Sequence, residues 1–195
     1  MRGTFPGAAA AALFSLLPAE AQCRDAGFPS ASERAWSAEP IDLVVNGGFE
    51  DPAIDNYRFF DEGISGWTVS RDRIEIINQS YGQGLQARSG RQFLALNGAG
   101  GLYQEISTRP DTIYRLVFHM AREPDAKGPT TLVVNAGTTQ ADYTIPLAQS
   151  GYRRETLSFR GAVGTVTRIA ISSTTAAEAG PLVDDVSIEV AGSEE

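Results

Sequence analysis

The residues best suited to chemistry in this sequence are two pairs of acids at opposite ends of one region. Glu50 and Asp51 occur in the stretch NGGFEDP, and Asp184 and Asp185 interrupt the apolar stretch LVDDVSIEV. If the second stretch is a strand, Asp185 points one way and Asp184 shares the opposite face with Leu182, Val186, Ile188 and Val190. A carboxylate on an apolar face is costly unless hydrogen bonds or a cation compensate its desolvation. Two hypotheses stay open: a calcium site built from carboxylate and carbonyl oxygens, or acids that cap a turn and lie at a strand edge.

The sequence lacks the motifs of the common catalytic classes. His119 is the single histidine, and no nucleophile or orienting acid marks a triad around it, so we expect an ordinary strand histidine. There is no His-Glu-x-x-His motif, cysteine pair or EF-hand loop, and the glycine-rich NGAGG precedes a strand. We therefore expect no enzyme activity. Glycoside hydrolysis by two carboxylates remains an alternative, with Glu50, Asp51, Asp61, Glu75, Asp184 and Asp185 as its candidates.

Sugar recognition is a second chemistry that the sequence allows. Aromatic faces contact the apolar side of a pyranose ring, and amides or acids bind its hydroxyls. The segment NQSYGQGLQ, residues 78–86, has amides on both sides of a tyrosine and predicts a ligand loop, although a plain solvated loop fits it too. We expect Tyr57, Asn78, Tyr81 and Tyr103 to bind a ligand; the other candidates are Phe59, Phe60, Gln79, Gln83 and Gln86.

Composition limits the partners and the location. The chain has 195 residues and a formal net charge of −8, with its basic residues scattered singly, so we expect no nucleic-acid partner. Arg2, a short apolar run and the triplet AEA predict a signal peptide over residues 1–21, and no later run is long enough to span a membrane. We expect a secreted, extracellular or periplasmic protein. Cys23, the single cysteine, excludes an intrachain disulfide; lipid anchoring through it is the alternative to a cysteine without a packing role.

The elements that must position these residues are short strands. After a linker over 22–40, eleven apolar or alternating runs follow from IDLVV at 41–45 to LVDDVSIEV, with turn residues between them. Tyr114, Leu116, Phe118 and Met120, for example, lie on one face of their run. Only 54–60 and 175–179 are weak helical possibilities. The pattern predicts one all-β, antiparallel jelly-roll sandwich over 41–190 with a tail at 191–195. First and last strands commonly lie side by side in a jelly roll, which would bring Glu50 near Asp184.

The stretches LVVNGGFEDP, ISGWTV, ARSGRQFLALNG and LVDDVSI follow one another in this order. Their combination resembles the sequences of galactose-binding-like jelly-roll domains. In particular, the chain looks like domain-of-unknown-function family 642 of plant cell-wall proteins and related bacterial secreted proteins, over roughly 41–190. The resemblance implies a non-catalytic extracellular domain that associates with polysaccharide, with Trp67 in the core. Related carbohydrate-binding modules imply a structural calcium held here by Glu50 and Asp184, with the carbonyls of Gly48 and Arg91 as further ligands.

The sequence also departs from its relatives. Arg88 and Ser89 stand where some relatives place another acid, and the cysteines and second tandem domain of the plant family are absent. We expect a secreted, non-catalytic carbohydrate-binding module that recognises a cell-wall or extracellular polysaccharide. The alternatives are a structural or adhesive surface protein without a sugar pocket, and third a glycoside hydrolase or lyase. An exposed aromatic platform would favour the first function, and a sheet face of small polar residues the second.

Overall fold

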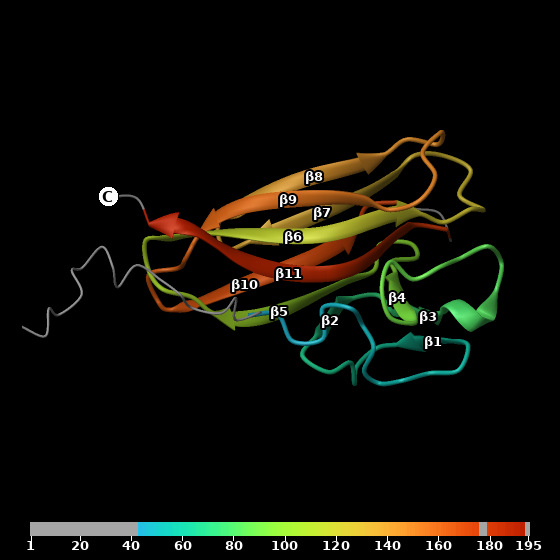
Figure 1. Cartoon of the computed structure of the whole chain (residues 1–195), viewed down its shortest axis with the longest axis horizontal. Helices are drawn as coiled ribbons and strands as arrows, with labels where there is room; N and C mark the ends of the chain where they lie inside the picture. Colours follow the sequence, from blue (N-terminus) through green and yellow to red (C-terminus); the bar gives the residue numbers. More distant parts are fainter. Residues whose placement is uncertain (1–42, 176–178, 194–195) are drawn as a thin grey trace, which may run out of the picture. The chain divides into compact units, whose positions relative to one another are not determined.

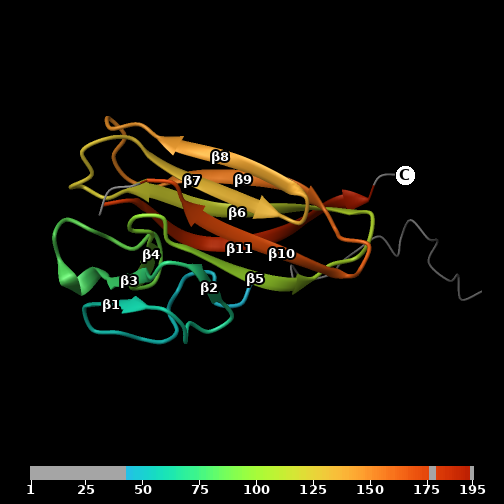
Figure 2. The same ribbon diagram turned by 180° about the vertical axis from the view of Figure 1, so that it is seen from behind.

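The computed structural model describes residues 43–175 and 179–193, which form eleven strands in two antiparallel sheets (Figures 1 and 2). The six-stranded sheet has the order β1-β3-β4-β11-β6-β9, with β1 Tyr57–Phe60, β3 Ile74–Asn78, β4 Gln92–Ala95, β11 Pro181–Ser193, β6 Thr112–Arg122 and β9 Arg153–Arg160. The five-stranded sheet has the order β2-β5-β10-β7-β8, with β2 Thr68–Arg71, β5 Gly101–Ser107, β10 Val166–Ser173, β7 Thr130–Ala136 and β8 Thr139–Ile145. The predicted all-β jelly-roll sandwich is confirmed.

Alternating apolar residues of the two sheets meet in the main core. Leu116, Phe118 and Met120 of β6 are fully buried, as are Leu132 and Val134 of β7. Intervening residues of β7 are partly exposed, so the strand buries one face and presents the other, as period-two patterning requires. Trp67 also lies in this core, as expected.

The predicted strand at 41–45 is wrong for its described part, because residues 44–48 form a bend and turn. Asn46 and Phe49 have φ values of 55° and 56°, which an extended strand does not contain. The Gln104 side chain replaces a neighbouring strand here: its amide accepts from Val45 N at 2.8 Å and donates to Val45 O at 2.9 Å. Gly47 lies directly against β11, where its carbonyl accepts from Val186 N. A Cβ at Gly47 would overlap the Val186 carbonyl, so glycine is required at this approach.

The outer face of the six-stranded sheet carries a second, smaller core. Ile77, Phe93, Ala95, Ala121 and Leu182 are buried there beneath Leu85. Leu85 belongs to the segment that follows the 3₁₀ helix η1 (Gln79–Tyr81) and leads to β4. This segment, residues 82–91, therefore covers part of the sheet and has to be held against it.

The remaining expectations concern the two helical possibilities and the two ends of the chain. The helical possibility at 54–60 is wrong because residues 57–60 form β1. Residues 176–178 of the second possibility, the signal peptide, the linker and Cys23 lie outside the described residues. β11 extends to Ser193, so residues 191–193 continue the strand. Within the part of the chain that the structure describes, no helix has the length and apolar character needed to span a bilayer.

Candidate functional site

The last strand contains an irregularity that changes where its acids point. The register of β11 against β6 shifts between Asp184 and Ser187, and Asp185 has a φ of 50°. Val186 and Ile188 face the main core, whereas Leu182 belongs to the outer small core. The prediction that Asp184 shares a face with Val186 and Ile188 is therefore wrong. The bulge adds a residue, so the side-chain alternation restarts after it.

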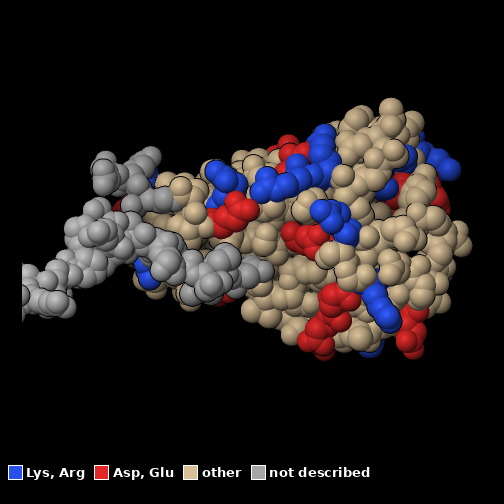
Figure 3. Space-filling view, viewed as in Figure 1, with Lys and Arg blue, Asp and Glu red and all other residues tan. Residues whose placement is uncertain are grey.

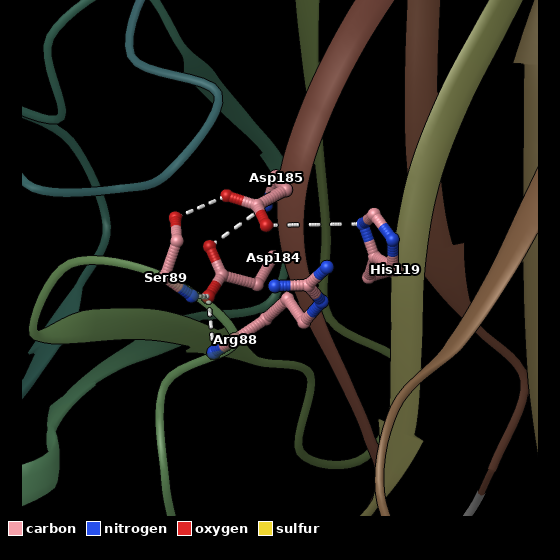
Figure 4. Close-up of polar contacts among 5 residues, drawn as sticks. All are labelled: Arg88, Ser89, His119, Asp184 and Asp185. Carbon is pink, nitrogen blue, oxygen red and sulfur yellow. Dashed lines mark hydrogen bonds and ion pairs between the residues drawn. The ribbon is translucent and has the colours of Figure 1, made fainter.

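Asp184 is nonetheless fully buried, with 0% of its surface exposed, beneath the 82–91 segment. Its Oδ2 accepts from the backbone N–H groups of Arg88 at 2.7 Å and Ser89 at 3.2 Å, and its Oδ1 accepts from Asp185 N at 2.7 Å (Figure 4). Burial raises the pKa of Asp184 to about 7, and the neighbouring Asp185 charge adds to this, while the three N–H donors oppose it. The carboxyl group thus fixes the loop through its main chain.

Glu50 fixes the next part of the same loop. Its Oε1 accepts from Arg91 N at 2.7 Å and Gln92 N at 2.8 Å. Gly90, between the two sets of bonds, has a φ of +59°, and a Cβ there would overlap the Glu50 carboxylate. The two acids predicted to meet therefore hold one segment, residues 88–92, from two sides. Glu50, which follows the glycine-rich turn, thus serves as a main-chain acceptor for this segment.

The donor set near these acids is compatible with a hard cation. A Cβ added at Gly48 would lie 3.8 Å from Asp184 Oδ1 and 3.8 Å from Glu50 Cγ, so both side chains come near Gly48. A carboxylate offers about four lone-pair sites, of which the described bonds use three on Asp184 and two on Glu50. The Arg91 carbonyl accepts from Gln79 N at 2.8 Å. In the described ranges, no three His, Cys, Asp or Glu side chains gather as a metal group, so carbonyls would have to complete a site.

His119 and Asp185 lie on the outer face beside this anchor. His119 Nδ1 is 3.9 Å from Asp185 Oδ2, and the Ser89 hydroxyl donates to Asp185 Oδ1 (Figure 4). Burial lowers the pKa of His119, and the positive charge of Arg88 lowers it further. A neutral histidine in a strand, paired opposite Arg154 of β9, agrees with the expected structural role.

The structure brings two of the four predicted ligand residues together. Tyr57 of β1 and Tyr81 of η1 have ring centroids 4.8 Å apart at 57°, and Phe59 lies 6.1 Å from Tyr57. The residues Tyr57, Tyr81 and Phe59 are 45%, 38% and 39% exposed, respectively. The Arg73 guanidinium lies 4.1 Å from the Phe59 ring centroid, which leaves the tyrosines as the more open faces. We call Tyr57, Phe59 and Tyr81 the aromatic surface.

Asn78 and Tyr103 do not join the aromatic surface. Asn78 is buried and caps η1: its side chain accepts from Ser80 N at 2.9 Å and donates to Ile54 O at 2.8 Å. Tyr103 is on the other sheet, where the Arg168 guanidinium lies 4.0 Å from its ring centroid and is held by Glu105 at 2.8 Å. Both residues therefore have partners that fix them in place.

The outer face of the five-stranded sheet carries mainly small or polar side chains. One row across the sheet pairs Thr68 with Tyr103, Tyr103 with Ala170, Ala170 with Asn135 and Asn135 with Gln140. Tyr103, covered by Arg168, is the aromatic residue of this row. The exposed rings of the domain are thus concentrated at the β1 edge of the other sheet.

Sequence reasoning named Glu75 as one candidate carboxylate but missed Glu123 and its proximity to Glu75. Glu75 is buried and accepts from Asn97 Nδ2 at 2.6 Å, and burial raises its pKa. Glu123 follows β6, and burial followed by the nearby charges of Glu75 and Asp125 raises its pKa to about 7. Asn97 Oδ1 and Glu123 Oε1 are both buried without a hydrogen-bond partner. Nothing in the spacing of Glu75 and Glu123 signals that they lie near each other, because β3 and the end of β6 are far apart in sequence.

Comparison with solved structures shows the fold of related domains. A family 61 carbohydrate-binding module in complex with β-1,4-galactotriose (TmCBM61) is 15% identical, with a TM-score of 0.51, and the match covers 76% of this chain and 98% of that one. The CBM22-1 xylan-binding domain of Xyn10C from Paenibacillus barcinonensis is 15% identical, with a TM-score of 0.50, over 71% of this chain and 94% of that one. At such identity the likeness establishes the jelly-roll architecture and not the ligand.

Sequence comparison gives the family. A comparison with curated proteins finds no match. The sequence profile of a family described as protein of unknown function (DUF642) matches residues 42–189, which is most of the chain. The chain belongs to the DUF642 family.

Proposed function

We propose that this protein is an exported, non-catalytic carbohydrate-binding module whose ligand lies on the aromatic surface. The observation that carries the proposal is the exposure of Tyr57 and Tyr81 side by side on β1 and η1. Large exposed rings in a group indicate a binding surface, whereas scattered ones are ordinary. The fold shared with carbohydrate-binding modules supports the same conclusion.

The geometry of the rings suggests what form of glycan they contact. The Tyr57 ring is tilted 57° from Tyr81 and 83° from Phe59, so the rings form a cradle and not one plane. Rings at different angles fit the successive sugars of a twisted polysaccharide chain better than they fit the flat surface of a crystalline polysaccharide. A soluble or hydrated polysaccharide chain is therefore the expected ligand.

The charge around the aromatic surface favours an uncharged glycan. Between residues 50 and 75 the chain exposes six acids and three arginines, whereas the seventh acid, Glu75, is buried. Acidic side chains gather on the lower part of the face in Figure 3, whereas arginines are more frequent above. Unscreened negative charge repels a polyuronate within about 10 Å at ordinary ionic strength. Neutral polysaccharides should bind at this surface more tightly than acidic ones.

The remaining parts of the proposal rest on the sequence and on the acid pair. Export is supported by the apolar N-terminal run and AEA triplet, and the absence of catalytic motifs supports a binding role. The calcium part is supported by the approach of Asp184 Oδ1 and Glu50 Cγ to the same glycine, Gly48. We include a structural calcium, held by Glu50 and Asp184 with carbonyls of Gly48 and Arg91, in the proposal. It would offset the negative charge that burial makes costly on Asp184.

Binding to polysaccharides before and after removal of one ring tests the function. Dissociation constants for galactan, xylan and polygalacturonate are measured by affinity electrophoresis and calorimetry. Tyr57→Ala and Tyr81→Ala should each weaken binding to the best neutral polysaccharide about tenfold, since loss of a central aromatic contact costs about 1–2 kcal/mol. Tyr103→Ala is the matched control and should leave binding unchanged. Equal losses in all three variants, or none, would contradict the assignment of the surface.

The structural or adhesive alternative has an observation in its favour. The outer face of the five-stranded sheet presents mainly small or polar residues, and Arg168 covers Tyr103 on this face. If no polysaccharide binds while the folded protein self-associates or attaches to cell-wall material independently of Tyr57, that alternative replaces the binding module.

A further inference from the structure

The sequence predicts a ligand role for Asn78, but the structure places it where the two tyrosine-bearing segments of the aromatic surface meet. Asn78 is the last residue of β3 and is 8% exposed. The segment 54–56 leads into β1 and Tyr57, and η1, which follows Asn78 directly, ends with Tyr81. Asn78 N donates to Asn56 O at 2.6 Å, so the first segment runs along it. A buried residue at this junction can act on the rings without contacting a ligand.

The side chain of Asn78 links the two segments. Its Oδ1 accepts from Ser80 N of η1 at 2.9 Å, and its Nδ2 donates to Ile54 O at 2.8 Å. The Ser80 hydroxyl adds a second link by donating to Asp55 O. Because one partner of the Asn78 amide is a donor and the other is an acceptor, the orientation of the amide is fixed. A single buried amide therefore joins the segment before Tyr57 to the turn that carries Tyr81.

The turn η1 depends on such hydrogen bonds for its position. It has three residues, and none of them is buried. A single 3₁₀ turn is not stable by itself, because it forms few hydrogen bonds for the residues that it orders. Gln79 N donates to Arg91 O at 2.8 Å, and Gly82 N donates to Gln79 O at 3.2 Å. Hydrogen bonds at the start of the turn, and not a packed face, thus determine where Tyr81 lies.

A second buried amide holds the other segment. Gln92 is 1% exposed and is the register partner of Asn78 on β4. Its Oε1 accepts from Ile54 N at 2.6 Å while Asn78 donates to Ile54 O, so side-chain amides bind both polar groups of the Ile54 backbone. Gln92 Nε2 also donates to the carbonyls of Phe49 at 2.7 Å and Pro52 at 3.1 Å. The segment ahead of β1 is thereby fixed to the end of the sheet.

We propose that Asn78 is a positioning residue for glycan binding. It holds the Tyr57 and Tyr81 rings at their centroid separation of 4.8 Å and their tilt of 57°, so the cradle exists before a polysaccharide arrives. Groups that are already ordered lose less conformational freedom on binding, and the affinity is higher for that reason. The inference rests on the proposed function, because it assigns to Asn78 an effect on glycan affinity that is exerted through the two tyrosines.

Gln104 offers a matched control, because it holds another segment in the same way. It is 5% exposed, lies on β5 of the other sheet, and binds both Val45 N and Val45 O through its amide. Asn78→Leu and Gln104→Met each remove one amide while keeping a side chain of similar size. Each leaves one backbone N–H and one C=O without their side-chain partner, so both variants should have lower melting temperatures.

Asn78→Ser is a milder variant that remains informative if Asn78→Leu does not fold. Serine is as good a capping residue as asparagine, so its hydroxyl can still accept from Ser80 N. Its shorter side chain does not reach Ile54 O. The variant therefore keeps the cap of η1 and removes the link to the segment before Tyr57.

Two measurements on the full chain report the effect. Nuclear Overhauser effects between the Tyr57 and Tyr81 rings report the ring separation by NMR, with Tyr57→Phe and Tyr81→Phe to assign the signals. Affinity electrophoresis gives the dissociation constant for the neutral polysaccharide that the wild type binds best. Both Asn78 variants should weaken the ring–ring effect and raise the dissociation constant about threefold to tenfold, which is no more than the loss of Tyr81 itself. Gln104→Met should change neither.

A double-mutant cycle shows whether Asn78 acts through Tyr81. In the Tyr81→Ala background, Asn78→Ser should change the affinity by less than about twofold, because the ring that it positions is absent. A loss as large as in the wild-type background would show that Asn78 acts on the glycan by another route, and the inference would fail.

The remaining outcomes separate this inference from the proposed function. Asn78 variants with the wild-type ring–ring effect and affinity would refute the positioning role, even if Tyr57→Ala and Tyr81→Ala lose binding as the function requires. Equal losses of affinity in Asn78→Leu and Gln104→Met would also refute it, because reduced stability would then explain both. If the wild type binds no polysaccharide, the proposed function fails, and the ring–ring effect in the Asn78 variants still decides whether Asn78 holds the two tyrosines together.

Discussion

Replacing Asp184 by asparagine tests whether its buried carboxyl group anchors the 82–91 segment. An asparagine has one acceptor oxygen where the carboxylate has two. The native side chain accepts three backbone N–H bonds, two on Oδ2 and one on Oδ1. The best orientation of the amide keeps the pair from Arg88 and Ser89 and turns its NH₂ group toward Asp185 N. At least one buried donor loses its partner.

The expected size of the effect follows from that lost bond. One buried unsatisfied N–H costs about 1–3 kcal/mol, and removal of the buried negative charge offsets part of this cost. For a domain of this size, 1 kcal/mol changes the melting temperature by about 2–4 °C. We expect Asp184→Asn to lower it by about 3–8 °C. Asp184→Ala leaves three donors unpaired and should lower stability by several kcal/mol, near the total for a small domain.

The assay is thermal and urea unfolding with and without a calcium chelator. Asp185→Asn removes the same charge from the next residue, which is partly exposed and receives the Ser89 hydroxyl instead of backbone N–H groups; its effect should stay below about 1 kcal/mol. If calcium is bound at 100 times its dissociation constant, chelation removes about 2.7 kcal/mol from the wild type. Chelation should change Asp184→Ala little and Asp185→Asn as much as the wild type.

Two results would refute different parts of this reasoning. Equal stability losses in Asp184→Asn and Asp185→Asn would show that the main-chain bonds to Asp184 do not anchor the segment. A wild-type melting temperature unaffected by chelation would end the calcium proposal and leave the hydrogen-bond anchor in place.

Three further predictions concern stability and activity. Gly90→Ala should lower the urea midpoint by at least the equivalent of about 1 kcal/mol, because its φ is +59° and a Cβ would overlap the Glu50 carboxylate. Gly84→Ala is the control for backbone strain alone, since its φ is +75° but its Cβ would meet open space. Equal losses of stability in the two variants would exclude an effect of the overlap. The pKa of Glu123 is raised from 4.5 to about 7, so the folded state binds the extra proton and stability should fall as pH rises between about 4.5 and 7. Glu123→Gln should reduce that slope and exceed the wild type in melting temperature at pH 8, and an unchanged slope would contradict the raised pKa. Purified protein should release no reducing ends from polysaccharides, and steady release abolished by one carboxylate substitution would establish an enzyme.

The sequence was sufficient to predict the strands of the sheets, because the alternation of apolar and polar residues within each strand shows which face is buried. Tyr114, Leu116, Phe118 and Met120, which were predicted to share one face, are all buried in the main core on β6. The first strand was not predictable in this way: LVV is apolar, but the positive φ values of Asn46 and Phe49 and the amide of Gln104 turn it into a loop. Apolar composition alone does not distinguish the two.

The candidate sites depended on long-range features that a single sequence does not display. The acids at the two ends of the domain act on the same loop, as their positions suggested, but the bulge at Asp185 moved Asp184 to the other face. Tyr57 and Tyr81 meet because β1 pairs with β3, which leads directly into η1. The Glu75–Glu123 pair combines a residue of β3 with one that follows β6, which only the folded sheet brings together.

The way in which Glu50 and Asp184 hold residues 88–92 has a consequence for how this surface can change over evolution. Both acids accept hydrogen bonds from backbone N–H groups, which nineteen of the twenty amino acids possess. These bonds therefore do not depend on which side chains the segment carries. Proline is excluded at positions 88, 89, 91 and 92, and position 90 requires glycine. Residues 88, 89 and 91 are exposed, although the Ser89 hydroxyl also donates to Asp185 Oδ1. Mutation can therefore vary the chemistry displayed by this segment while its path across the sheet stays the same.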